Sequence, residues 1–308
     1  MPESLSIIIV TYNRTIPLRD ALVSASRLEP KPLEILVIDQ TSDLPEEELA
    51  WREAHIRENP EVRFLSNQPP NAQAARNKGI LEARGSVVML MDDDVIVPRD
   101  LVEKHLRNYK DPSIAAISGM ILEPEQEPTF EYPDAYNDPK LGFIFFPLNY
   151  GERTELVNLS SCNCSVRREY ALGIGGFDEN FTKTLFDDSD FGWRLHQYCE
   201  SKELKMIHDP EAWLTHLRIP TGGGRPGAKN SHVLGDRNAW YTWCYFHFQH
   251  WGRASFIRLA RRYRWWIWHK RNLLQPWWIV VAHWELIVGV GWAFLRILKG
   301  PLLIKINN

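Results

Sequence analysis

The chain has 308 residues, which is enough for one large or two modest domains with a sizeable hydrophobic core. Hydrophobic residues make up 44% of it and charged residues 24%, a globular composition that excludes disordered and fibrous classes. The formal net charge of −3 is unevenly spread, because 14 of the 36 Lys and Arg but only 2 of the 39 Asp and Glu follow Leu217. Ten of the 13 Trp also follow Leu217, so an acidic body precedes a basic, Trp-rich tail.

The four cysteines do not indicate a disulfide framework. They form no CxxC pair, so we expect reduced thiols in a cytosolic setting. Cys162 and Cys164 could form a soft metal pair, but no partner His or Cys lies near them in the sequence, and burial in the core is the preferred interpretation. Residues 1–20 lack the basic start and apolar run of a signal peptide, so we expect the catalytic body not to be exported.

Strand and helix patterns alternate through the first third of the chain and predict βαβ units with right-handed crossovers. Apolar, β-branched runs predict the strands, and apolar residues at helical spacing predict the helices between them. The predicted strands cover residues 5–10, 33–38, 62–65 and 87–91, and the predicted helices cover 18–28 and 71–84.

Three consecutive carboxylates, Asp92, Asp93 and Asp94, follow the fourth predicted strand. Adjacent anions repel one another, so a bound divalent cation would compensate them, and oxygen ligands suit Mg²⁺ or Mn²⁺. Open α/β sheets bind ligands at the carboxyl ends of their strands, where such a metal suits a nucleotide-diphosphate substrate. An acidic turn that caps the next helix is the alternative.

Two common nucleotide-binding motifs are missing, because no GxGxxG follows the first strand and no GxxxxGK[ST] is present. Four other motifs, in this order, resemble the family 2 glycosyltransferases. They are Thr11-Tyr12-Asn13-Arg14, the Asp39 to Asp43 run, Ala75-Arg76-Asn77-x-Gly79 and Asp92-Asp93-Asp94. The resemblance covers roughly residues 5–217 and implies the GT-A fold, a Rossmann-like, mostly parallel central sheet flanked by helices.

The resemblance also implies a donor site. Thr11 and Tyr12 would frame the nucleotide base, and Arg14 would belong to the same site. Asp39 would accept a hydrogen bond from the base imide, although a helix N-cap is its other interpretation. Arg76 would lie near the base or the diphosphate, where a solvated helix face is the alternative.

The same resemblance implies a metal site. Asp92 would contact the ribose and take part in metal binding, Asp93 would belong to the donor site, and Asp94 would ligate Mn²⁺ or Mg²⁺ at the diphosphate. His216, which follows a predicted strand at 204–207, would complete the metal site, although a lone His is often structural. UDP is the expected nucleotide, with dTDP and GDP as alternatives.

The middle of the chain is expected to bind the acceptor. Residues 98–109 predict a helix, 114–122 a strand, 123–138 a Pro-rich acidic loop, and 143–146 a strand or part of an acceptor groove. The Gly175-Gly176-Phe177-Asp178-Glu179 run resembles a turn that lies beside the acceptor in the family, so Gly176 and Phe177 are expected there.

Residues 185–195 resemble the family pattern Glu-Asp-x-Asp-Leu-x-x-Arg-Leu, with Asp187 in place of Glu. The resemblance implies that Asp188 is the general base of an inverting transfer, with Asp187 and Asp190 on the acceptor side. Repulsion from these two neighbours would raise the pKa of Asp188 toward the operating pH. The motif also begins a predicted amphipathic helix, whose N-terminus would attract the same carboxylates, and both interpretations can hold.

The Gly-rich run 221–227 is interpreted as a mobile lid from which Arg225 reaches the diphosphate, with a plain linker as the alternative. Residues 230–248 and 253–271 predict helices, and Arg interleaved with Trp is typical of an anionic membrane surface. Nucleic acid is not expected, because the acidic body would repel it. Residues 277–298 are long enough to span a bilayer, but Glu285 lies on a less apolar stripe, which favours a helix in the interface.

These expectations give three segments and one function. Residues 1–220 form a GT-A catalytic domain with a nucleotide-binding half (1–95) and an acceptor half (96–220), followed by a flexible loop (221–229) and a helical, membrane-associating tail (230–308). The expected function is metal-dependent, inverting sugar transfer to a lipid-linked or membrane-proximal acceptor in surface polysaccharide synthesis, at the cytoplasmic membrane face. A non-catalytic nucleotide-sugar-binding protein and a sugar nucleotidyltransferase are the alternatives.

Overall fold

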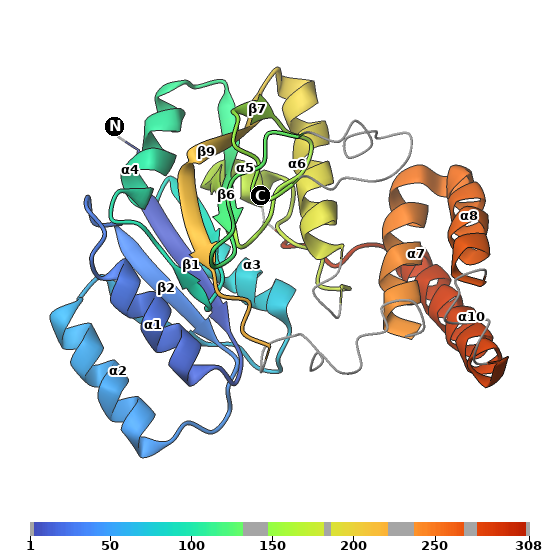
Figure 1. Cartoon of the computed structure of the whole chain (residues 1–308), viewed down its shortest axis with the longest axis horizontal. Coiled ribbons are helices and arrows are strands. Elements are labelled where there is room, and N and C mark those ends of the chain that lie inside the picture. Colours follow the sequence, from blue (N-terminus) through green and yellow to red (C-terminus); the bar gives the residue numbers. More distant parts are fainter. Residues whose placement is uncertain (1–2, 132–146, 182–185, 221–236, 268–275, 306–308) are drawn as a thin grey trace.

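The computed structural model describes residues 3–131, 147–181, 186–220, 237–267 and 276–305. Within these residues, one nine-stranded sheet has the order β3-β2-β1-β4-β8-β6-β9-β5, and β7 pairs with β9 (Figure 1). The strands are β1 Leu5–Thr11, β2 Glu34–Asp39, β3 Val62–Ser66, β4 Val87–Met91, β5 Val95–Ile96, β6 Ile114–Leu122, β7 Thr154–Glu155, β8 Asn163–Arg167 and β9 Lys205–His216.

The first four long strands form a parallel block, as the alternating sequence pattern predicts. β1 pairs in parallel with β2 and β4, and β2 pairs in parallel with β3. The register places Thr11 beside Asp39, and Ile9 beside Met91. Because parallel strands end at the same edge, the polar residues that follow β1 and β4 are brought together there.

Three antiparallel pairings, which the sequence patterns did not reveal, complete that edge. β8 lies between β4 and β6, antiparallel to both, with Met91 opposite Asn163. β5 pairs antiparallel with β9, with Val95 opposite His216. The predicted strand at 204–207 is therefore only the start of β9, which continues to His216.

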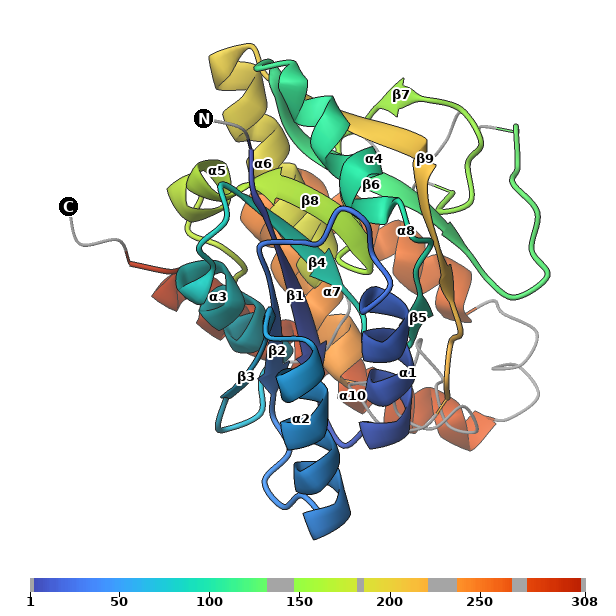
Figure 2. The same cartoon turned by 90° about the vertical axis from the view of Figure 1, so that its left-hand side faces the viewer.

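Helices cover both faces of the sheet (Figures 1 and 2). Side chains of α1 and α4 pack with one face of β1, and those of α3, α5 and α6 pack on the other face. The predicted helix at 98–109 is shorter in the structure, where α4 is followed by a 3-10 turn at Arg107–Lys110. The helices are α1 Thr15–Ala25, α2 Glu46–Glu58, α3 Ala72–Glu82, α4 Leu101–Leu106, α5 Arg168–Gly173, α6 Asp187–Lys202, α7 Arg237–Trp251, α8 Ser255–Ile267 and α10 Pro276–Lys299.

The helix α2 was not predicted, because its buried side is polar. Its buried residues are Glu48, Arg52 and His55, so it has no apolar stripe. Arg52 pairs with Glu48 at 2.8 Å and with Asp39 at 2.6 Å, and these ion pairs connect α2 to the end of β2.

The tail helices pack on one another and on the acceptor half (Figure 1). α7 is buried on almost every side, and Phe181 shares its apolar cluster. Glu285 of α10 pairs with Arg237 of α7 at 2.7 Å, and a Cβ on Gly289 would lie 2.5 Å from the Arg237 carbonyl oxygen. Glu285 and Gly289, which belong to the less apolar stripe of α10, therefore face α7.

After α10 the chain returns to the catalytic domain. The backbone N–H of Ile304 donates to the Gly175 carbonyl, and that of Glu179 donates to the Leu302 carbonyl. Among the described residues, no helix combines the length and the apolar character that crossing a bilayer requires. The predicted lid at 221–227 with Arg225, and the apolar run 143–146, lie outside the described residues.

Candidate active site

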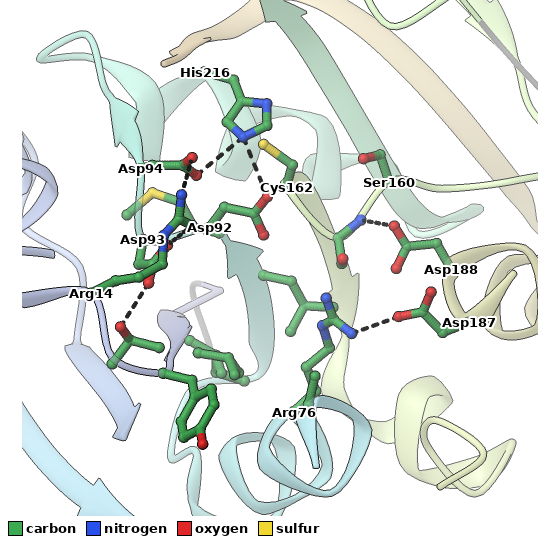
Figure 3. Close-up of a pocket in the computed structure, with 18 of the residues that line it drawn as sticks. Arg14, Arg76, Asp92, Asp93, Asp94, Ser160, Cys162, Asp187, Asp188 and His216 are labelled. Carbon is green, nitrogen blue, oxygen red and sulfur yellow. Dashed lines mark hydrogen bonds and ion pairs between the residues drawn. The ribbon is translucent and has the colours of Figure 1, made fainter. Parts of the chain in front are cut away.

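A cavity opens at the carboxyl ends of β1 and β4, where the aspartate triplet lies on one side and the first turn of α6 on the other (Figure 3). Most of the predicted site residues meet here, although they come from five separate parts of the chain. The predicted residues that line the cavity are Thr11, Tyr12, Arg14, Arg76, Asp92, Asp93, Asp94, Asp187, Asp188 and His216.

Arg14 forms ion pairs with two members of the aspartate triplet. Its guanidinium lies 2.6 Å from Asp93 Oδ1 and 2.8 Å from Asp94 Oδ2, and the Thr11 hydroxyl donates to Asp93. Burial nevertheless raises the pKa of Asp93 to about 7, helped by the charges of Asp92 and Asp94 and opposed by Arg14. Burial also acts to raise the pKa of Asp94, but the hydrogen bond and charge of His216, together with Arg14, outweigh it and hold that pKa well below its usual range.

Ligand atoms of three residue types converge beside the triplet. The His216 Nε2 atom lies 3.1 Å from Asp94 Oδ1 and 3.7 Å from Asp92 Oδ2. One ligand atom each of Asp92, Cys162 and His216 lie within 4.8 Å of one another, and Asp92 is partly exposed to the cavity. Asp94, also a predicted ligand, accepts hydrogen bonds at Oδ2 from Arg14 and the Ile219 backbone, and its Oδ1 contacts His216.

The preferred interpretation of the Cys162-x-Cys164 pair, burial in the core, is confirmed for both residues, which belong to the two apolar clusters on either side of the sheet. No His lies near the pair in the sequence, but β9 brings His216 to Cys162 from 54 residues further along the chain. Burial, followed by the charges of Asp92 and Asp94, raises the pKa of the Cys162 thiol well above its ordinary value.

Asp187 and Asp188 occupy the first turn of α6, but their partners differ. Asp187 Oδ2 accepts hydrogen bonds from Arg76 at 2.8 Å and from Gln73 at 2.9 Å. Asp188 Oδ2 accepts one from the Ser161 backbone at 3.0 Å, whereas Asp188 Oδ1 is buried with no hydrogen-bond partner among the described residues. Burial and then the charge of Asp187 raise the pKa of Asp188, against the opposing charge of Arg76.

Three residues expected on the acceptor side do not line the cavity. Both carboxylate oxygens of Asp190 are bonded, one to Arg194 and the other to His250 of α7. The Phe177 ring is buried and stacks on Phe191 at 4.2 Å between ring centroids. Gly176 has a left-handed φ of +67°, and a Cβ there would lie 2.4 Å from the Asn77 Oδ1 atom. The Phe177 ring lies under the Arg76 guanidinium and supports it. The expected contribution of Asp190 to the pKa of Asp188 is not found, because the main causes of that shift are burial and Asp187.

Asp39 is also absent from the cavity lining. Its Oδ1 accepts a hydrogen bond from the Thr41 backbone at 2.8 Å, and its Oδ2 pairs with Arg52 at 2.6 Å. The neighbouring Gln40 lines the cavity instead. Arg218 also lines it and was not predicted, because nothing in the sequence separates this Arg from the other basic residues of the tail.

Comparison with known proteins agrees with this geometry. Residues 6–173, more than half of the chain, match the family model described as glycosyl transferase family 2. The chain is 22% identical over 237 residues to "Uncharacterized glycosyltransferase YfnE" of Bacillus subtilis (strain 168), which covers 62% of this chain and 60% of that protein. It is 30% identical over 119 residues to the poly-beta-1,6-N-acetyl-D-glucosamine synthase of Staphylococcus aureus (strain COL), covering 38% of this chain and 28% of that protein. The chain therefore spans less than two thirds of either relative.

Among solved structures, the fold is similar to that of GalNAc-T7 with UDP, GalNAc and Mn²⁺. The TM-score is 0.59 at 16% sequence identity, with 89% of this chain and 57% of that chain covered. This likeness supports the GT-A fold, and the match to the family model covers the whole parallel block together with β8. The chain belongs to glycosyl transferase family 2.

Proposed function

We propose that this protein transfers a sugar from a nucleotide-diphosphate sugar to an acceptor hydroxyl, with inversion at the anomeric carbon. The observation that carries the proposal is that only one carboxylate oxygen of Asp188 has a hydrogen-bond donor among the described residues. Its Oδ2 is fixed by the Ser161 N–H, while its buried Oδ1 has no hydrogen-bond donor among the described residues. A buried acceptor atom without a donor is costly, and an acceptor hydroxyl entering the cavity would supply one.

In the proposed step, Asp188 removes the proton of that hydroxyl as its oxygen bonds to the anomeric carbon. The bond from that carbon to the diphosphate breaks, and its electron pair leaves with the nucleotide. A base in this role works best when its pKa is close to the operating pH, and the raised pKa of Asp188 meets that requirement. Asp187, the other carboxylate of α6 that lines the cavity, is paired with Arg76, and this leaves Asp188 as the base.

The donor nucleotide is proposed to lie along the ends of β1 and β4, with its base at Thr11 and Tyr12. Asp92, Asp94 and His216 are the proposed ligands of Mn²⁺ or Mg²⁺, and the cluster of ligand atoms around Asp92 fits a divalent cation. When bound, such an ion would neutralise charge on the leaving diphosphate. The UDP and Mn²⁺ of the GalNAc-T7 structure support UDP and Mn²⁺ here, with dTDP and GDP as alternative nucleotides.

A donor screen tests this proposal. UDP-, dTDP- and GDP-sugars would be incubated with the protein and Mn²⁺, and donor turnover and the anomeric configuration of the product would be followed by nuclear magnetic resonance. We expect turnover of one nucleotide class and an inverted product. A retained configuration, or nucleotide-sugar binding without any turnover, would contradict the proposal. Release of pyrophosphate from a nucleoside triphosphate and a sugar 1-phosphate, in a separate incubation, would indicate a nucleotidyltransferase instead.

We further propose that the tail binds the cytoplasmic membrane face and brings the site to a lipid-linked or membrane-proximal acceptor in surface polysaccharide synthesis. α10 carries exposed apolar side chains at helical spacing, and α8 adds exposed Phe256 and Ile257 together with Arg261 and Arg264. Apolar side chains beside Arg suit an anionic bilayer surface. The large apolar residues of α10 that are exposed include Val280, Val281, Trp284, Ile287, Trp292, Phe294, Leu295 and Leu298.

Vesicle sedimentation tests the membrane proposal. The full chain is expected to sediment with anionic phosphatidylglycerol vesicles and less with neutral phosphatidylcholine vesicles. The double variant Trp284→Asp/Ile287→Asp should lose most of this binding. Ile16→Asp is the matched control, because Ile16 is an equally exposed apolar residue on the catalytic domain. Undiminished binding of the double variant would contradict a membrane role for this face.

A further inference from the structure

The side chain of Cys162 lies beside His216 and Asp92 in the candidate metal site, although no sequence motif assigns it there (Figure 3). The register of the sheet explains its position. Met91 lies opposite Asn163 in the antiparallel pair of β4 and β8, so Asp92 and Cys162 are neighbours where that pair ends. Val95 lies opposite His216 in the pair of β5 and β9. Two strand pairings therefore fix the three residues around one point.

The three ligand atoms differ in chemical type. A carboxylate oxygen of Asp92, the Sγ of Cys162 and a ring nitrogen of His216 all lie within 4.8 Å of one another. Asp92 Oδ2 and His216 Nε2 are 3.7 Å apart, close to the separation of about 3.5 Å expected between two ligands of one metal ion with bonds of 2.0–2.3 Å. Cys162 is 6% exposed and lines the cavity.

We infer that Cys162 is a metal ligand and that, with Asp92 and His216, it makes the site selective for an ion softer than Mg²⁺. This inference rests on the metal site of the proposed function. Thiolate and imidazole ligands favour Zn²⁺ and Co²⁺ over Mg²⁺, which prefers carboxylates, phosphates and water. On binding, the S–H bond of Cys162 breaks, the proton passes to solvent and a sulfur electron pair forms the bond to the metal, with no change of oxidation state.

Asp94 contacts the same nitrogen of His216. Its Oδ2 accepts hydrogen bonds from Arg14 and the Ile219 backbone, whereas its Oδ1 lies 3.1 Å from His216 Nε2, the atom that lies 3.7 Å from Asp92 Oδ2. An imidazole nitrogen that binds a metal ion carries no proton, so it cannot donate to Asp94 at the same time. When the ion binds, Asp94 Oδ1 is therefore available as a ligand beside Asp92, Cys162 and His216.

Spectroscopy on the purified full chain tests the inference without relying on activity. Co²⁺ and Cd²⁺ would be titrated into the protein with UDP present, and the charge-transfer absorption of a metal–thiolate bond would be recorded. We expect the band in the wild type and its loss in Cys162→Ser. Cys164→Ala is the matched control, since Cys164 is also buried but does not line the cavity, and it should keep the band.

Binding affinities provide the second measurement. Calorimetry should show that Cys162→Ser weakens Co²⁺ binding relative to Mg²⁺ by about tenfold or more. In wild-type protein, Zn²⁺ alone should also protect Cys162 from alkylation, measured by peptide mass spectrometry, whereas Mg²⁺ alone should not. This measurement needs no variant and remains informative if Cys162→Ser does not fold.

The outcomes separate the inference from the proposed function. A band that persists in Cys162→Ser, or Co²⁺ binding to the wild type without any band, would overturn the role of Cys162 and leave the metal-dependent transfer standing. If no divalent ion binds the wild type in the presence of UDP, both proposals fail.

Discussion

Asp94 and Asp188 lie on opposite sides of the cavity, and their pKa values are shifted in opposite directions (Figure 3). On the strand side, Arg14 and His216 hold the pKa of Asp94 far below its ordinary value. On the helix side, burial and Asp187 raise the pKa of Asp188, and one of its oxygens has no hydrogen-bond partner among the described residues. The surroundings thus suit two Asp residues to two different tasks. Asp94 keeps its negative charge, and Asp188 can accept a proton.

The largest expected effect comes from removing the proton acceptor. Asp188→Asn keeps the shape of the side chain and should lower turnover by about 10²- to 10⁴-fold, because positioned general bases contribute rate factors of that size. Nucleotide affinity should stay within a few-fold of wild type, since Asp188 lies across the cavity from the donor strands. Transfer assays and calorimetry on the same preparation check both parts. If Asp188→Asn kept near-wild-type turnover, Asp188 could not be the general base.

The second effect concerns the charge on the strand side. Arg14→Gln leaves Asp93 and Asp94 buried without their cation, which should lower the free energy of unfolding by about 3 kcal/mol. Mn²⁺ should restore part of this loss, because a bound cation replaces the missing charge. Urea unfolding with and without Mn²⁺ measures both values. An Arg14→Gln variant as stable as wild type would mean that the triplet does not need neutralising.

The third effect is on the pH dependence of turnover. Asp188 acts only when ionised, so kcat should fall as the pH drops through its raised pKa, at a higher pH than an ordinary carboxylate would give. Arg76 opposes that rise, so Arg76→Gln should move the acidic limb to a still higher pH. Arg84→Gln, a change of an exposed Arg remote from the cavity, is the control and should leave the profile unchanged. An unmoved profile in Arg76→Gln would contradict the assigned electrostatics.

The smallest effect is on stability at neutral pH. Because folding raises the pKa of Asp188, the folded state is destabilised when the pH rises from the ordinary carboxyl value through the raised pKa. Asn does not titrate, so Asp188→Asn should be more stable than wild type at neutral pH, by on the order of 1 kcal/mol. The gain should disappear in acid. Denaturant unfolding at two pH values measures it, and a destabilised variant at neutral pH would argue against the raised pKa.

The sequence predicts the parallel block well because each of its strands is a continuous apolar run ending in polar motifs. Thr11 and Asp92 were assigned from motifs at the ends of these strands, and Asp188 from the motif that opens α6. Each of the three lines the cavity. Antiparallel β8 and the polar-sided α2 carry no comparable periodic signal, so they were not predicted.

What the sequence could not show depends on contacts between distant segments. The meeting of Cys162 with His216 needs the pairings of β8 and β9, and the contribution of Ser161 comes from its backbone N–H. Asp190 matches a motif but bonds His250 of the tail, a contact that no local pattern predicts. The tail helix α7 was expected as a helix, but the nearly complete burial of its residues follows from packing against α6 and α10.

A crystal structure of the protein with Mn²⁺ and UDP tests the division of the cavity most directly. The account predicts the ion bound at Asp92 and His216, with the diphosphate on the strand side and Asp188 Oδ1 free to face an acceptor across the cavity. An ion at Asp187 and Asp188, or a nucleotide bound with the aspartate triplet turned away from it, would contradict the account.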